Sequence, residues 1–294
     1  MTATRPVSKS PAETEPDTQI ARRLVALDID GTLLVTGQLP TPAVVAAIRA
    51  ASDAGHELVL ATGRSLSGAL AAARVLGIGE GYVVASNGSI VAKLTRAGCE
   101  VTEIHTVDAK AVVELVSNVR PDLQIAAEII GTGYHVSRRF PPAELGGDQV
   151  QVTELSDLWT APTPRLVIYG ANAQNLVRSI RSGGMTAIRT RADWVDVTPG
   201  GVSKATALES LRRKLDIPRD RTVAIGDSEN DIPMLTWANR GVAMGHASAL
   251  VRFSANYATK SIEDDGAALI LNALAHSGTE PMGAARLRAS CVVT

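Results

Sequence analysis

The chain has 294 residues, of which 29 are basic and 30 acidic, and its formal net charge is −1. This balance, without a clustered basic stripe, argues against a nucleic-acid-binding surface. Hydrophobic residues make up 45% of the chain but aromatic ones only 3%, so aliphatic side chains must build the core. No apolar stretch reaches the roughly 18 residues of a membrane span. With two distant cysteines and no disulfide framework, we expect a cytoplasmic protein of about two domains.

Both ends of the chain are expected to lie outside the folded part. Residues 1–19 are rich in Pro, Thr, Ser and charge and lack the apolar segment of a signal peptide. We predict a disordered leader over 1–20 and a flexible tail over 277–294. The ending Cys291-Val292-Val293-Thr294 superficially fits a prenylation box, but Thr is untypical at the last position and no polybasic segment precedes it, so we interpret the match as coincidence.

Short apolar strands alternate with alanine-rich helices in the two outer parts of the remaining chain, which is typical of a parallel α/β sheet. Thr41-Pro42 opens the first helix, since Thr caps a helix N-terminus and Pro suits its first position. Gly55 stops that helix. The other predicted segments are strands at 24–28, 57–61 and 82–86, a helix at 65–76, and later a helix at 204–215, strands at 222–225 and 241–244, and a closing helix at 264–275.

Between these outer parts the pattern changes. Consecutive strands separated by short turns indicate an antiparallel α+β unit inserted into the first domain. Its predicted strands are 90–94, 100–106, 124–130, 133–136 and 165–169, and its predicted helices are 108–119 and 172–182. We therefore predict a core domain formed by 21–88 and 192–276, interrupted by a second domain over 89–191.

The most informative motif follows the first strand and reads Asp28-Ile29-Asp30-Gly31-Thr32-Leu33. Two carboxylates two residues apart at the end of a buried strand resist joint ionisation unless a cation or a proton holds them. We interpret Asp28 as a nucleophile and Asp30 as an acid/base, both organised by Mg2+. Taken alone, the motif also fits an acidic strand-to-loop turn.

Two further motifs carry groups that suit a phosphate. Thr62, in Ala61-Thr62-Gly63-Arg64 after the second strand, can present its hydroxyl and backbone N–H to a phosphate oxygen. An ordinary Ser/Thr helix cap is the alternative there. Lys204 opens a helix after Gly200-Gly201-Val202-Ser203, where its charge opposes the helix dipole unless an anion lies in front. A solvated lysine is the alternative at that position.

A fourth motif runs from Gly226-Asp227 to Leu235. Ser228 and Asp231 form a capping arrangement, and acids are favoured in a first helical turn. Asp227 lies at the strand tip, before that cap, so helix capping does not explain it. A carboxylate at such a position most naturally faces a metal ion or another charge.

Topology brings the motifs together. In an open parallel sheet the functional site lies at the carboxyl ends of the strands, where the strand order reverses. If the second and third strands lie on one side of the first and the fourth on the other, Asp28 and Asp227 face each other across that crevice. Several carboxylates in one cleft need a hard divalent cation, and Mg2+ prefers a few carboxylates with waters and substrate phosphate. Lys204 and Thr62 add phosphate-binding groups.

At this point the chain resembles the haloacid dehalogenase-like (HAD) superfamily, specifically the Cof-type phosphatases with a large C2-type cap (subclass IIB). The matching segments are Asp28 through Leu33, Thr62-Gly63-Arg64, Ser86-Asn87-Gly88, Lys204, and Gly226-Asp227 with Asn230-Asp231. The resemblance covers about residues 22 to 275, and the insertion stands where the family has its C2 cap. It implies a Rossmann-like doubly wound parallel sheet core with an inserted α+β cap domain. His246 departs from the family, which usually has Asn there, and this weakens any transfer of substrate contacts in that late loop.

The resemblance also implies a mechanism. Asp28 attacks phosphorus and forms an aspartyl-phosphate, while Asp30 protonates the leaving alkoxide and then takes a proton from water. Mg2+ would be held by the carboxylates of Asp28 and Asp227 and by the backbone carbonyl of Asp30. The phosphate-binding residues would be Thr62, Gly63, Lys204 and Asn230, with Asp231 as a support that orients Lys204. Dehalogenating relatives lack a carboxylate at the Asp30 position, so its presence favours phosphoryl transfer.

We predict a Mg2+-dependent phosphatase acting on a small-molecule phosphate ester, with neither nucleic acid nor membrane as a partner. Sugar phosphates, phosphorylated polyols, nucleotides and pyridoxal phosphate all stay open as substrates, and the sequence gives no oligomeric state. Two alternatives also stay open: a phosphotransferase or phosphomutase that uses the same aspartyl-phosphate, and a non-catalytic phospholigand-binding regulator. The role of Asn87 is equally open, between a substrate contact and a turn-forming Asn-Gly.

Overall fold

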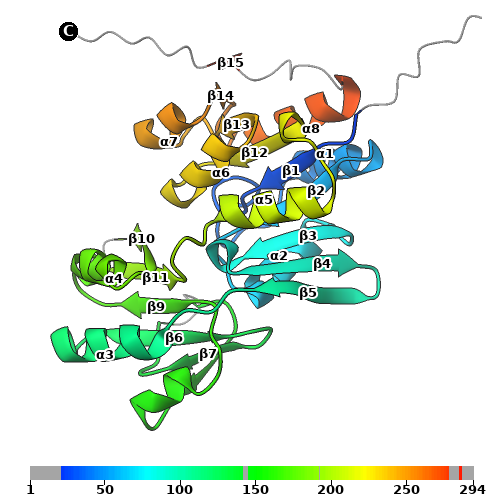
Figure 1. Ribbon diagram of the computed structural model, residues 1–294. Coiled ribbons are helices and arrows are strands. Elements are labelled where there is room, and N and C mark those ends of the chain that lie inside the picture. Colours follow the sequence, from blue (N-terminus) through cyan, green and yellow to red (C-terminus); the bar gives the residue numbers. More distant parts are fainter. Residues whose placement is uncertain (1–20, 142–144, 192, 278–284, 287–294) are drawn as a thin grey trace, which may run out of the picture.

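The computed structural model describes residues 21–141, 145–191, 193–277 and 285–286. The predicted leader and most of the predicted tail lie outside these residues. The described chain forms two sheets, each with its own helices, stacked one above the other in Figure 1. No helix in the described ranges is both long and apolar enough to cross a bilayer.

The larger sheet has nine strands in the order β15-β14-β13-β12-β1-β2-β3-β4-β5. Its strands are β1 (Leu24–Leu27), β2 (Glu57–Ala61), β3 (Gly81–Ala85), β4 (Ile90–Thr95), β5 (Gly98–Ile104), β12 (Thr222–Gly226), β13 (Arg240–Ala243), β14 (Tyr257–Ala258) and β15 (Ala285–Arg286). The strands from β14 to β3 run parallel, and β4, β5 and β15 are added antiparallel. The doubly wound parallel core predicted from the sequence is confirmed.

Helices cover both faces of this sheet, because alternate residues of a buried strand point to opposite faces. Val25 and Leu27 of β1 pack in one apolar cluster with α1 (Pro42–Asp53), α2 (Leu66–Val75) and α8 (Gly266–Ser277). Leu24 and Ala26 pack in the other with α5 (Lys204–Lys214), α6 (Ile232–Trp237) and α7 (Ala249–Ser254). Thr41 caps α1 as predicted, since its hydroxyl accepts a hydrogen bond from the backbone N–H of Val44.

The strand order places the site. β2 and β3 lie on one side of β1 and β12 lies on the other, so the order reverses between β1 and β12, as the sequence predicted. In register, Leu24 of β1 is paired with Thr222 of β12 and with Glu57 of β2. The carboxyl ends of β1, β2 and β12 therefore lie side by side at one edge of the core.

The smaller sheet has six strands in the order β10-β11-β9-β6-β7-β8. They are β6 (Gln124–Ile129), β7 (Gly133–Val136), β8 (Asp148–Gln151), β9 (Leu166–Tyr169), β10 (Thr186–Arg191) and β11 (Trp194–Thr198). The helices α3 (Ala109–Val119) and α4 (Val177–Ser182) cover one face of this sheet. Tyr134, Phe140 and Trp194 pack in a separate cluster, and Tyr134 and Trp194 line a cavity together with Asp28 of the core domain. We call this unit the cap.

At both junctions between core and cap, strands pair with the sheet of the other domain than the predicted boundaries assign them to. The segment 90–104, assigned to the insertion, forms β4 and β5 of the core sheet, because a tight turn after β3 returns the chain as its antiparallel neighbour. The segment 194–198, assigned to the core, forms β11 and pairs with β9 and β10 of the cap. A change from parallel to antiparallel pattern in the sequence marks a change of strand direction, which need not coincide with a change of domain.

Candidate active site

The side chains named from the four motifs meet at the strand ends between β1 and β12. Asp28 directly follows β1 and Asp227 directly follows β12. Lys204, the first residue of α5, is 1% exposed, and its Nζ donates to Asp28 Oδ1 at 2.7 Å and to Asp231 Oδ1 at 2.6 Å. Residues separated by about 200 positions in sequence thus share one site, because parallel strands deliver their carboxyl ends to the same edge.

Asp28, Asp227 and Asp231 form an acidic cluster in which ligand oxygens lie within 4.8 Å of one another. The turn after β1 approaches this cluster so closely that a Cβ at Gly31 would lie 2.4 Å from Asp227 Oδ2, and Gly31 has a φ of +81°. Glycine is therefore required there. Thr32 of the same turn donates from Oγ1 to Asp227 Oδ1 at 3.0 Å.

The electrostatics of the cluster favour a bound cation. Burial, followed by the nearby charge of Asp231, raises the pKa of Asp28 well above its usual value and raises that of Asp227. Burial alone would lower the pKa of Lys204, but Asp231 and Asp28 outweigh it and raise that pKa. One ammonium group thus faces three carboxylates, and an oxygen-only donor set with excess negative charge fits a hard cation such as Mg2+.

Asp231 differs from the other two carboxylates because both of its oxygens are already used. Oδ1 accepts from Lys204, and Oδ2 accepts from the backbone N–H groups of Asp227 and Ser228 at 3.0 and 2.9 Å. The supporting role predicted for Asp231, orienting Lys204, uses the Oδ1 contact. The residues that could hold Mg2+ are therefore Asp28 and Asp227 through their carboxylates and Asp30 through its backbone carbonyl.

The side chain of Asp30 lies in different surroundings from that of Asp28. Arg64 donates to it twice, from Nε at 2.7 Å and from a terminal nitrogen at 2.6 Å, and Thr36 Oγ1 donates at 3.3 Å. The Asp30 side chain is 40% exposed, whereas Asp28 is 4% exposed. The hydrogen bonds to Asp30 raise the pKa of Arg64. Sequence reasoning assigned no role to Arg64; its signal was its place in the Thr-Gly-Arg motif.

Thr62, Gly63 and Asn230 lie together on the wall of a cavity of about 950 Å3, with Asp28, Asp30 and Asp227. A Cβ at Gly63 would lie 3.4 Å from Asn230 Nδ2, so the phosphate-binding candidates are in close contact. Thr62 accepts at Oγ1 from the backbone N–H of Arg64 at 3.1 Å. Lys204 and Asp231 do not line this cavity and are buried behind it.

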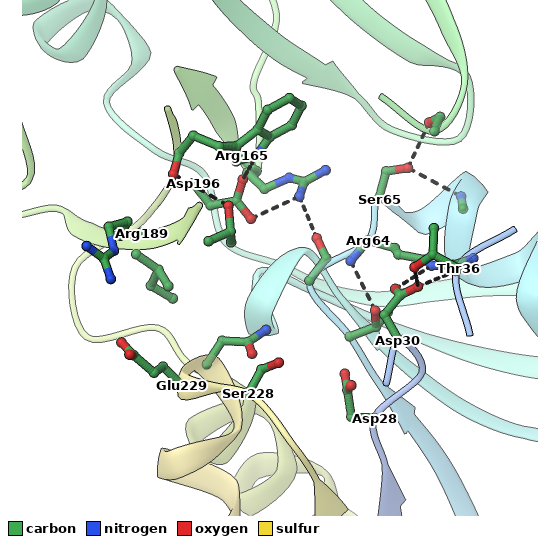
Figure 2. A pocket seen from close by; sticks show the side chains of 18 of the residues that line it. Asp28, Asp30, Thr36, Arg64, Ser65, Arg165, Arg189, Asp196, Ser228 and Glu229 are labelled. Carbon is green, nitrogen blue, oxygen red and sulfur yellow. Dashed lines mark hydrogen bonds and ion pairs between the residues drawn. The ribbon is translucent and has the colours of Figure 1, made fainter. Parts of the chain in front are cut away.

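The opposite wall of the cavity belongs to the cap, and the sequence did not identify the cap residues that form it. Figure 2 shows Arg165, Arg189 and Asp196 across the cavity from Asp28 and Asp30. Arg165 precedes β9, Arg189 lies in β10 and Asp196 in β11. The strands β10 and β11 were not predicted, so no pattern in the sequence pointed to these residues.

His246 lies beside the acidic cluster. Its Nε2 is 3.8 Å from Asp227 Oδ2, and its Nδ1 accepts from the backbone N–H of Ile262 at 3.3 Å. The sequence marked His246 only as a departure from the Asn that the family usually has at this position. His246 lies near Asp227 because it follows β13, and β13 is paired with β12, the strand that Asp227 follows.

Known proteins share this architecture. A family model described as haloacid dehalogenase-like hydrolase matches residues 25–157 and 166–271. An HMP-PP phosphatase from Yersinia pseudotuberculosis is 30% identical over 242 residues, which cover 76% of this chain and 84% of that one. A solved HAD phosphatase from Bacteroides thetaiotaomicron superposes with a TM-score of 0.73 at 27% identity, covering 90% and 98% of the two chains. A solved subclass IIB sugar phosphatase has the same fold, with a TM-score of 0.70 at 21% identity. The match covers 84% of this chain and 96% of that one.

A doubly wound core that gathers carboxylates and a lysine beneath an α+β cap defines the class of capped HAD-like hydrolases. The chain belongs to the haloacid dehalogenase-like family. The family match supports its assignment to the Cof-type branch, and its activity class is phosphoric monoester hydrolysis.

Replacing Asp227 by Asn tests the metal site. We expect Asp227→Asn to weaken Mg2+ binding by at least about 100-fold, as measured by titration calorimetry. Because the folded-state pKa of Asp227 is raised, its ionised form costs stability above that pKa, and the cost disappears as the pH falls through it. Metal-free Asp227→Asn should therefore melt above the metal-free parent at pH 8, and the difference should shrink as the pH falls toward the usual range of a carboxyl pKa.

The matched control is Asp53→Asn, which removes an exposed carboxylate at the end of α1 whose ion pair with Arg49 spans 3.8 Å. It should change neither Mg2+ binding nor the pH dependence of melting. Equal Mg2+ affinity in parent and Asp227→Asn would exclude Asp227 as a ligand.

Proposed function

We propose that this enzyme is a Mg2+-dependent phosphatase that hydrolyses a small phosphomonoester, a sugar phosphate or a similar metabolite, through an aspartyl-phosphate intermediate. The observation that carries the proposal is the state of the Asp28 carboxylate. Its Oδ1 is held by Lys204, and among the described residues no group donates a hydrogen bond to Oδ2. One oxygen is thus anchored and the other is available at the cavity wall for attack on phosphorus.

The chain's own groups can perform both half-reactions. Asp28 Oδ2 bonds to phosphorus as the ester P–O bond breaks, and Asp30 gives its proton to the departing alkoxide. Asp30 then accepts a proton from the water that attacks phosphorus, which releases phosphate and restores the Asp28 carboxylate. Thr62, Gly63 and Asn230 bind the phosphoryl oxygens. Asp28, Asp30 and Asp227 would hold Mg2+, which would neutralise negative charge in the site.

The two aspartates suit these different roles because their surroundings differ. Asp28 is buried and fixed by Lys204, which gives a nucleophile with one orientation. Asp30 lies at the exposed side of the same cavity, where a leaving group and then a water molecule can reach it. Arg64 holds the Asp30 carboxylate in that position with two hydrogen bonds.

Several features support a small and polar substrate. The cavity of about 950 Å3 is closed on one side by the cap, and its cap wall carries arginine, aspartate and tryptophan side chains. The related HMP-PP phosphatase and subclass IIB sugar phosphatase are named for substrates of this kind. The cytoplasmic location expected from the sequence is part of this proposal.

The decisive experiment measures phosphate release from a broad panel of phosphate esters with Mg2+, with chelator, and after Mg2+ is restored. We expect release from small phosphomonoesters in Mg2+ alone, and recovery on repletion. Product analysis with an added acceptor alcohol distinguishes hydrolysis from phosphoryl transfer, because transfer yields a new ester in place of free phosphate. A protein that binds these esters but releases no phosphate under any condition would be a regulator, contrary to the proposal.

A further inference from the structure

A chain of hydrogen bonds connects the cap to the phosphate side of the cavity. Asn230 Nδ2 donates to Asn87 Oδ1 at 3.0 Å, and Asn87 Nδ2 donates to Asp196 Oδ2 at 3.3 Å. Asp196 belongs to cap strand β11, whereas Asn87 lies in the core turn that follows β3. Asn230 lies in the short helical turn η5 (Glu229–Asp231) after β12. We call these three residues the amide relay.

The carboxylate of Asp196 fixes the direction of both amides. An ionised carboxylate only accepts hydrogen bonds, while a primary amide has one donating and one accepting end. Only the Nδ2 end of Asn87 can therefore face Asp196, and Oδ1 of Asn87 must face Asn230. Asn230 in turn must present Nδ2, which uses one hydrogen for Asn87 and keeps the second.

Asp196 is itself held rigidly. It is 3% exposed, and it also accepts from Trp194 Nε1 at 3.1 Å and from a terminal nitrogen of Arg165 at 3.3 Å. Arg165 donates as well to the backbone carbonyl of Gly63, in the phosphate-binding loop. Two separate contacts thus connect the Asp196–Arg165 pair of the cap with Asn87 and Gly63 of the core.

Asn87 has no freedom to turn away. Ser86, Asn87 and Gly88 all have positive φ angles, of 49°, 55° and 107°, a conformation that side-chain-bearing residues rarely adopt. The backbone N–H of Asn87 donates to the carbonyl of Thr62 at 3.0 Å. A Cβ at Gly88 would lie 2.3 Å from the carbonyl oxygen of Ser203, so this turn is packed directly against the start of α5.

We propose that Asp196 is a positioning residue for phosphate binding: through Asn87 it turns the amide of Asn230 so that Nδ2, and not Oδ1, faces the phosphoryl oxygens. The inference rests on the proposed function, which puts the phosphoryl group beside Gly63 and Asn230. Because Asp196 is in the cap, phosphate binding by the core depends on the docked cap. The relay also gives Asn87 a role that is neither a substrate contact nor a simple turn.

The test replaces the carboxylate by an amide of the same shape. In Asp196→Asn, residue 196 can donate or accept, so both amides of the relay can reverse and turn Asn230 Oδ1 toward an anion. We expect the affinity for inorganic phosphate, measured by calorimetry with Mg2+, to fall at least about 10-fold, the scale of one hydrogen bond to a charged group. KM for p-nitrophenyl phosphate should rise in parallel, while kcat changes by less than about 3-fold.

Glu128→Gln is the matched control. Glu128 is the other buried carboxylate paired with Arg165, at 3.3 Å, but it contacts Ser86 and not Asn87. This variant loses the same kind of charge at the same arginine and leaves the relay intact, so phosphate affinity should stay within about 2-fold of the parent. If loosened cap docking were the cause, Glu128→Gln and Asp196→Asn would lose phosphate affinity alike.

A double-mutant cycle with Asn87→Ala completes the test. Asn87→Ala breaks the relay at its centre, so it should weaken phosphate binding by itself, and adding Asp196→Asn should have no further effect. Additive losses, an Asp196→Asn protein with unchanged phosphate affinity, or unchanged affinity in Asn87→Ala would each overturn the relay. The last outcome decides the matter even if Asp196→Asn does not fold.

Phosphate binding is measured without turnover, so the two proposals fail separately. If the parent binds phosphate, Asp196→Asn binds it more weakly and neither hydrolyses any ester, the relay is supported and the phosphatase proposal is contradicted. If the protein is an active phosphatase and Asp196→Asn leaves its phosphate affinity unchanged, the phosphatase proposal is supported and the relay is contradicted. A parent protein that does not bind inorganic phosphate with Mg2+ would contradict the relay, while phosphate release from the ester panel would still decide the phosphatase.

Discussion

Asp28→Asn is expected to lower phosphatase turnover by at least about 10^4-fold, the scale of losing a catalytic nucleophile. An amide nitrogen or neutral oxygen does not attack phosphorus as a carboxylate does, so no aspartyl-phosphate can form. The fold should survive, because an Asn at this position can still accept from Lys204 while Asp231 remains as the second partner of that lysine. The measurement is phosphate release with the best ester of the panel.

Thermal unfolding of metal-free Asp28→Asn provides the structural control. Burial raises the pKa of Asp28 well above normal, so its ionised form costs folding free energy at neutral pH. The variant should therefore melt at or above the temperature of the metal-free parent. Turnover comparable to the parent, with the protein correctly folded, would remove the covalent mechanism.

Asp30→Asn is expected to trap phosphorylated enzyme. The leaving group of p-nitrophenyl phosphate departs as the p-nitrophenolate anion and needs no proton from Asp30, so Asp28 can still be phosphorylated. Water then lacks its base, and steady-state turnover should fall by about 10^2- to 10^4-fold. Rapid mixing should show a burst of one p-nitrophenol per enzyme, and intact-protein mass spectrometry should detect one added phosphoryl group.

The control for this trap is the double variant Asp28→Asn/Asp30→Asn, which should show neither the burst nor the added mass. A mass increase that persists in the double variant would place the phosphoryl group on a residue other than Asp28. A slow Asp30→Asn enzyme without any burst would mean that Asp30 is needed before the phosphoenzyme forms, which contradicts the assigned division of roles.

Much of the core could be predicted because its signals are local. The alternation of apolar strands and capped helices identifies β1, β2, β3 and β12, and the motif at each strand end identifies Asp28, Thr62 and Asp227. Parallel topology then brings these ends to one edge, so the crevice follows from strand order alone. The contacts of Lys204 with Asp28 and Asp231 are the expected result of that arrangement.

The cap could be predicted only in outline. Strand β10 runs through polar residues such as Arg189 and Thr190, which do not indicate a buried strand in the sequence. Strand β11 was missed although its sequence, Trp-Val-Asp-Val-Thr, suits a strand. The hairpin β4–β5 was assigned to the insertion, because the sequence of a strand does not determine which sheet it pairs with. Arg165 and Asp196 carry no motif, so nothing marked them as neighbours of the phosphate-binding residues.

The sequence by itself determined the kind of chemistry. It places two aspartates after a buried strand, a lysine at the start of a helix and a third aspartate after a later strand. A bound cation stabilises such carboxylates, and a bound anion stabilises such a lysine. Only the tertiary structure decided which partner each group has. It paired Asp30 with Arg64, and it connected Asp196 through Asn87 to Asn230. The physical reason is that the number and type of donors and acceptors are properties of each residue, whereas their direction is set by neighbours that folding brings from distant parts of the chain.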